Sequence, residues 1–181
     1  MKGKPVRTMM VEIRVVNLEK GWRSGTNTFG DYIALLHTEV GEATDAYRSY
    51  KTVDVTDAAT GKPEGVGSEF ADVLIRILDL ADVFNLTLPP AWINLDMFRR
   101  IAPPAWITTF ADHTAWLHKA VAKLGGSLEP RGLVFRNAEL RELISSLLYV
   151  CDLYGIKLED EYERKIAFNR TRPFQHGGKV L

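Results

Sequence analysis

Apolar residues recur every three or four positions along most of this 181-residue chain, and this spacing predicts a fold built from α-helices. The clearest case is the segment 68–85, where the apolar positions form one helical stripe: Phe70, Val73, Leu74, Ile77, Leu80, Ala81 and Phe84. Ser68 stands at the start of this segment and is a candidate N-cap. Four further helices are expected over the ranges 29–51, 110–124, 137–154 and 158–169. The predicted fold is therefore all-α, a bundle of four to five main helices in one domain that spans residues 1–181.

The segments between the expected helices are rich in glycine, proline and small polar residues. The range 52–67 has four Gly or Pro and no helical period, so we expect a loop, with Lys62 on a candidate lid. Proline pairs at 89–90 and 103–104 bracket a segment that is expected to be helical only in part. The only strand candidate is the range 11–16, where four of six residues are Val or Ile.

Composition excludes several classes of protein. Lys and Arg number 23 and Asp and Glu number 23, and this zero formal charge disfavours a protein whose main work is coating nucleic acid. The single cysteine, Cys151, has no partner for an internal disulfide and lies in an apolar run, so it is expected to pack in the core. No stretch approaches the roughly 20 apolar residues of a membrane span, and charged residues interrupt the N-terminal segment before a secretory region can form. We therefore expect a cytoplasmic protein without a membrane partner.

Two pairs of carboxylates lie on the apolar side of consecutive predicted helices. Glu39 and Glu42 are three residues apart and share a helix face, and Glu69 and Asp72 repeat this spacing on the next helix. Like charges about 4 Å apart repel by about 4 kcal/mol at an effective dielectric constant near 20, and burying an unpaired charge is unfavourable. A cation is therefore expected among the four side chains. Oxygen donors without His or Cys suit Mg²⁺, with Mn²⁺ able to substitute.

The carboxylates have two other interpretations. Either pair alone is also typical of a solvated helix face. A di-iron centre in a helical bundle requires Glu-x-x-His motifs, and none of the four histidines has a Glu three residues before it. Two pairs that both intrude on an apolar face favour the magnesium site.

The second half of the chain contains a faint copy of the first. The range 68–88 aligns without gaps with 138–158, and the dipeptide 36–37 likewise matches 117–118. In this second copy an alanine and a lysine replace the first carboxylate pair. Chance alignment of two amphipathic helices is an equally good interpretation.

A true duplication would divide the domain into two helical hairpins. The hairpin at 21–88 would then be catalytic, and the range 105–181 would hold a degenerate hairpin and the basic C-terminal segment. A duplicated chain can form within itself the assembly that an unduplicated chain would make from two copies. A homodimer of this chain is the alternative.

The two carboxylate motifs resemble those of a known family. E-x-x-E at 39–42 followed by E-x-x-D at 69–72 is similar to the signature of the MazG-like all-α nucleoside triphosphate pyrophosphohydrolases. The contexts 35–43 and 69–76 resemble the two motifs, and the range 165–173 resembles the Lys, Asn and Arg segment that follows them. The resemblance therefore predicts an all-α enzyme that acts on nucleotides.

This resemblance covers about residues 21–82 and 159–179, and the segment 89–137 departs from a minimal member. It implies cleavage of a nucleoside triphosphate between its α- and β-phosphates, giving the monophosphate and pyrophosphate. Magnesium held by all four carboxylates would neutralise phosphate charge and lower the pKa of a bound water. Glu39 is the predicted general base because its apolar position should raise its basicity.

Six residues are predicted to bind the substrate: Lys165, Asn169, Arg172, Trp22, Asn27 and His37. Lys165 and Asn169 are four residues apart on one helix face, and Arg172 can bind a phosphate in bidentate fashion. A basic segment that only stabilises a helix C-terminus is the alternative. For Trp22 and His37, proposed near the nucleobase, packing in the core is equally compatible.

Three functions follow from these patterns. The first is magnesium-dependent hydrolysis of a nucleoside triphosphate, with a deoxynucleoside triphosphate as the expected substrate. The second is a sister activity on the same scaffold, acting on dUTP or on a phosphoribosyl nucleotide. The third is a catalytically silent helical protein with an oligomerisation or regulatory role. Nucleic-acid binding is disfavoured because no recognisable motif accompanies the basic residues.

Overall fold

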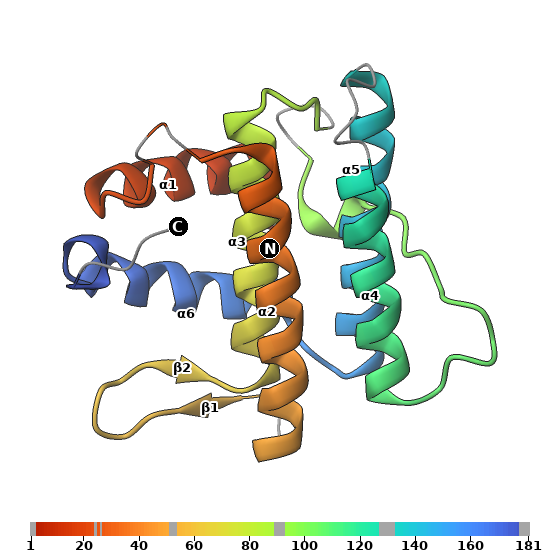
Figure 1. Ribbon diagram of the computed structural model, residues 1–181. Coiled ribbons are helices and arrows are strands. Elements are labelled where there is room, and N and C mark those ends of the chain that lie inside the picture. Colours follow the sequence, from red (N-terminus) through yellow and green to blue (C-terminus); the bar gives the residue numbers. More distant parts are fainter. Residues whose placement is uncertain are drawn as a thin grey trace.

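The computed structural model describes residues 3–23, 25, 27–50, 54–88, 93–126 and 133–177. In this part of the chain six α-helices account for most of the residues, which confirms the all-α class (Figure 1). They are α1 (Val6–Glu19), α2 (Phe29–Tyr50), α3 (Val66–Val83), α4 (Phe110–Gly125), α5 (Leu133–Leu153) and α6 (Leu158–Thr171). The remaining elements are short: the strands β1 (Val55–Thr56) and β2 (Pro63–Glu64), and 3₁₀ turns at Leu95–Met97 and Phe174–Gly177. No helix in these ranges is long and apolar enough to cross a membrane.

Helix α3 is the centre of the molecule. It packs against α2, α6, α1 and α5, and most of its residues are buried because it is apolar on nearly every side. Figure 1 shows α1 and α6 on one side of the α2 and α3 pair, and α4 and α5 on the other. Cys151 is buried in α5, in agreement with its predicted role in packing.

The N-terminal helix α1 was not predicted, and the expectation of a strand over 11–16 is wrong. The buried apolar residues of α1 are Val6, Met9, Ile13 and Val16, whose spacing is that of one helix face. The valines between them are exposed. Packing of this face against α3 therefore outweighs the strand preference of β-branched residues.

The predicted loop 52–67 contains a small antiparallel hairpin, in which β1 pairs with β2. Gly65 follows β2 with φ of 87°, a left-handed conformation that glycine adopts without strain, and α3 begins at the next residue. Ser68 therefore lies inside α3 and is not its N-cap. Its hydroxyl donates to the carbonyl oxygen of Pro63 at 2.8 Å and so fixes the hairpin to the helix.

The two hairpins of the proposed duplication end their second helices in the same way. After α3, Asn85 has φ of 50° and the Leu86 amide donates to the carbonyl of Ala81 at 2.8 Å. After α5, Gly155 has φ of 69° and the Ile156 amide donates to the carbonyl five residues before it, also at 2.8 Å. These positions differ by the offset at which the two sequences align. The two hairpins thus share a helix-ending geometry as well as a sequence pattern.

Candidate active site

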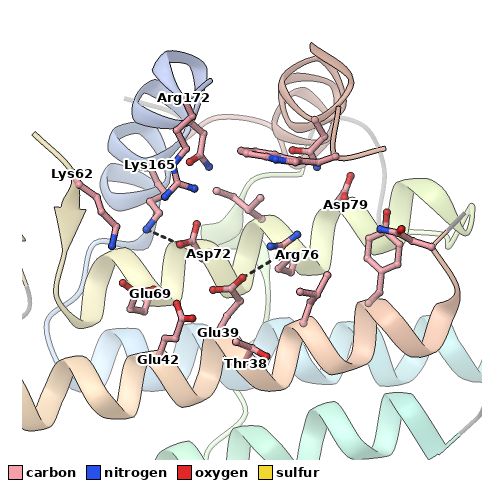
Figure 2. A pocket seen from close by; sticks show the side chains of 17 residues that line it. Thr38, Glu39, Glu42, Lys62, Glu69, Asp72, Arg76, Asp79, Lys165 and Arg172 are labelled. Carbon is pink, nitrogen blue, oxygen red and sulfur yellow. Dashed lines mark hydrogen bonds and ion pairs between the residues drawn. The ribbon is translucent and has the colours of Figure 1, made fainter. Parts of the chain in front are cut away.

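A cavity of about 570 Å³ lies over the antiparallel pair α2 and α3. Its walls come from α6, from the end of α1 and the segment that follows it, and from Lys62, which directly precedes β2 (Figure 2). The lining residues of α3 extend from Glu69 to Asp79, and those of α2 from Glu42 back to Tyr32. At 1.5 Å per residue each helix contributes a floor about 15 Å long. The cavity is therefore an elongated trough with two chemically different ends.

Three carboxylates meet at one end of this trough. Glu39, Glu69 and Asp72 each offer an oxygen that lies within 4.8 Å of the other two. Glu39 and Glu69 are only 7% exposed, so these charges are largely removed from water. Glu42 lines the same cavity, but it is exposed and is not one of the three. The structure thus brings three of the four predicted metal ligands together and places the fourth at the rim.

Burial changes the acidity of two members of this cluster. Together with the neighbouring carboxylates, it raises the pKa of Glu69 to about 7 and that of Glu39 to about 6. The cation of Lys165 opposes the effect on Glu69, and that of Arg76 opposes the effect on Glu39. Because the pKa values stay raised, the protein's own cations do not fully compensate the cluster. An added divalent cation would fit this donor set.

Two cations of the protein contact the cluster directly. Lys165 is 1% exposed, and its ammonium donates to the hydroxyl of Ser68 at 2.8 Å and pairs with Asp72 at 2.6 Å. Burial lowers the pKa of Lys165, but Asp72 and Glu69 outweigh burial and keep the pKa above its usual value. Arg76 Nε donates to Glu39 Oε1 at 3.0 Å. Each cation therefore holds one carboxylate of the cluster.

The opposite end of the cavity carries ring and amide side chains. Tyr32 and Asp79 line it, and Figure 2 shows Asp79 far from Glu69. Trp22 and Asn27 also line the cavity, and Trp22 directly precedes Arg23, which pairs with Asp79. Arg23 fixes Asp79 through a hydrogen bond from Nε of 2.9 Å. Burial, together with a hydrogen bond to Asp79, raises the pKa of Tyr32 to about 12, so its hydroxyl stays protonated and its oxygen can accept a hydrogen bond from a ligand. This end offers a stacking surface and hydrogen-bonding groups, as a nucleobase requires.

The C-terminal residues predicted to bind phosphate face the same cavity. Asn169 and Arg172 line it together with Lys62 of the hairpin. Asn169 is 5% exposed, and its Oδ1 atom has no hydrogen-bond partner among the described residues. Buried acceptors in folded proteins nearly always have a hydrogen-bond partner. A donor group on a bound ligand would supply the partner of this oxygen.

All but one of the predicted site residues line this cavity. Those present are Trp22, Asn27, Glu39, Glu42, Glu69, Asp72, Lys165, Asn169 and Arg172. His37 lies elsewhere, at the contact between α2 and α4, where its Nδ1 is 2.9 Å from Nδ1 of His118. It does not line the cavity, so the prediction that His37 binds the nucleobase is not retained.

Sequence reasoning missed several residues that line the site. Arg76 and Asp79 follow Asp72 by four and seven positions, so helix periodicity alone could have placed them on its face. Asn17 and Tyr32 come from different helices, and only the packing of α1 and α2 around α3 brings them to one end of the trough.

The second hairpin shows what replaces the carboxylate pair in the aligned copy. Lys123 of α4 pairs with Glu142 of α5. In the sequence alignment these positions correspond to Glu42 and Asp72. A lysine of the second copy thus neutralises a carboxylate whose counterpart in the first hairpin belongs to the acidic cluster.

Comparisons of this chain with protein-family models, with curated proteins and with solved structures find no match. The resemblance to MazG-like enzymes therefore rests on the motifs of the chain itself.

Proposed function

We propose that this protein is a Mg²⁺-dependent nucleoside triphosphate pyrophosphohydrolase, with a deoxynucleoside triphosphate as its expected substrate. The observation that carries the proposal is the cluster of Glu39, Glu69 and Asp72, two of them buried and the third half-buried, in a trough with cations beside it and a ring-lined far end. Carboxylates held this close and this dry are stable as anions only with further positive charge. A divalent cation supplies that charge, and a nucleotide bound to this cation would extend along the trough towards the ring-lined end.

Magnesium, or manganese in its place, would be held by Glu39, Glu69 and Asp72 and would supply charge neutralisation and a water of lowered pKa. Glu42 at the rim is available as a further ligand or to the water shell. The protein's own cations complete the phosphate site, since Arg172 and Lys62 both face the cavity at this end.

Glu39 is the general base in this proposal. Its burial raises its pKa to about 6, which increases its proton affinity while leaving it mostly ionised at neutral pH. It accepts a proton from the water whose oxygen bonds to phosphorus as the anhydride bond between the α- and β-phosphates breaks. Pyrophosphate leaves with the bridging oxygen and its electron pair, and Glu39 then returns the proton to solvent.

The far end of the trough holds the nucleoside. The indole of Trp22 offers a stacking surface, and its backbone amide donates to the Asn17 carbonyl at 2.8 Å, which fixes its position. The amide of Asn27 and the hydroxyl of Tyr32 supply hydrogen bonds to the base or sugar.

The direct test is release of pyrophosphate from a panel of nucleotides with Mg²⁺. The panel contains the common nucleoside and deoxynucleoside triphosphates, dUTP and a phosphoribosyl nucleotide, so it also separates the sister activities. Glu42→Gln and Glu69→Gln should each abolish turnover with unchanged helicity. Glu142→Gln, the matched control in the second hairpin, should keep it. A protein that binds no Mg²⁺ and turns over nothing on this panel would instead support a catalytically silent role.

A further inference from the structure

Arg76 occupies the middle of the trough. It projects from α3 between Asp72 and Asp79, and Figure 2 shows its guanidinium above Glu39. Its side chain is 30% exposed, so it opens onto the cavity rather than into the core. Arg76 is therefore a cation of the site that has no role in the mechanism proposed above.

The two carboxylates on either side of Arg76 along α3 have other cations as partners. Asp72 is paired with Lys165, and Asp79 is paired with Arg23. The ion pair of Arg76 in the described part of the chain is with Glu39, through Nε and Oε1 at 3.0 Å. A metal ion held by the cluster needs this same carboxylate. The guanidinium and the metal therefore compete for Glu39.

The position of Arg76 along the trough points to its second partner. It follows Asp72 by four residues, so its backbone lies about 6 Å along α3 from that of Asp72, towards the ring-lined end. If the polyphosphate lies at the cluster and the base near Trp22, the phosphate attached to the nucleoside is level with Arg76. A guanidinium binds a phosphate through two parallel hydrogen bonds, which makes this partner better than a single carboxylate oxygen.

On the basis of the proposed function, we propose that Arg76 binds the phosphate that remains on the nucleoside, and that it releases Glu39 to do so. Before metal and nucleotide bind, Arg76 is the ion-pair partner of the buried Glu39 carboxylate and compensates it in part. When they bind, Glu39 turns to the metal and its water, and Arg76 turns to the α-phosphate. The exchange leaves neither charge unpaired at any stage.

The test uses two binding measurements that need no turnover. Calorimetry at pH 8 measures the affinity for Mg²⁺ alone and, with Mg²⁺ present, the affinity for the nucleoside monophosphate product. Arg76→Gln should bind Mg²⁺ about three-fold more tightly, because a competitor for Glu39 is gone. It should bind the monophosphate about ten-fold more weakly, because a charge-assisted contact is lost. Arg76→Lys, which keeps the charge, should lie between the wild type and Arg76→Gln in both.

Arg14→Gln is the control, since the exposed guanidinium of Arg14 on α1 pairs with Asp82 of α3 and neither residue lines the cavity. Asp82 keeps its second partner, Arg23, when Arg14 is replaced. This control should change neither affinity. A folded Arg76→Gln variant whose Mg²⁺ affinity is unchanged or weaker, or whose monophosphate affinity is unchanged, refutes the role of Arg76. This outcome differs from failure of the proposed function, in which the wild type itself neither binds Mg²⁺ nor releases pyrophosphate.

Discussion

Replacing Glu69 by Gln should stabilise the metal-free protein, although the same change should abolish activity. Unfolded Glu69 loses its proton above its usual pKa of 4.5, whereas burial in the fold raises the pKa to about 7. The unfolding free energy of the wild type therefore falls as pH rises from 4.5 to about 7, and it stays lowered above that range. The uncharged amide of the Glu69→Gln variant carries no such dependence.

The size of the effect follows from the two pKa values. A tenfold change in a protonation equilibrium corresponds to about 1.4 kcal/mol, so raising the pKa from 4.5 to about 7 costs the wild type about 3 kcal/mol at pH 8. Glu69 is nearly buried, so solvent screens this cost little. Most of the difference between wild type and Glu69→Gln should disappear at pH 4.5, where both side chains are uncharged in the fold.

Urea unfolding followed by circular dichroism at pH 8 and pH 4.5 measures this difference directly, provided that both proteins have the same m-value. Addition of Mg²⁺ at pH 8 should stabilise the wild type more than the variant, since the metal relieves the repulsion that the substitution removes. Glu142→Gln, on the partly exposed pair with Lys123, should change stability by less than about 0.5 kcal/mol. Our account of the buried cluster fails if Glu69→Gln is no more stable than the wild type at pH 8.

Three further changes test other parts of the structure. His37→Ala should lower the unfolding free energy by about 1 kcal/mol, because it removes a hydrogen bond between helices. The KM for nucleotide should stay unchanged, since this contact lies away from the cavity. A raised KM would show that His37 contributes to substrate binding. Lys165→Met should lower the unfolding free energy by about 3 kcal/mol at pH 8, measured by urea unfolding, since it leaves Asp72 without its buried partner. A smaller loss would show that water reaches this ion pair. Thr109→Ala should lower the unfolding free energy by about 1 kcal/mol and leave turnover normal, because the Thr109 hydroxyl caps α4. An unchanged melting temperature would contradict that role.

Helix periodicity predicted most of the fold. Helices α2, α3, α4, α5 and α6 lie close to the expected ranges, because each buries a stripe of apolar residues that repeats every three to four positions. Helix α1 was missed because its β-branched residues also suit a strand, and only its contact with α3 selects the helical spacing of Val6, Met9, Ile13 and Val16. The strands β1 and β2 were missed because two residues are too few to show an alternating pattern.

The sequence by itself determined which acidic residues share a helix face, since the three-residue spacing of Glu39 with Glu42 and of Glu69 with Asp72 follows from the geometry of one helix. Only the tertiary structure decided which of these carboxylates lie close together, how deeply they are buried and which cations pair with them. A helical wheel gives the direction of a side chain but not the element that lies opposite it. Lys165 from α6 and Arg76 from α3 reach the cluster because α3 is surrounded by other helices, and their contacts depend on that packing.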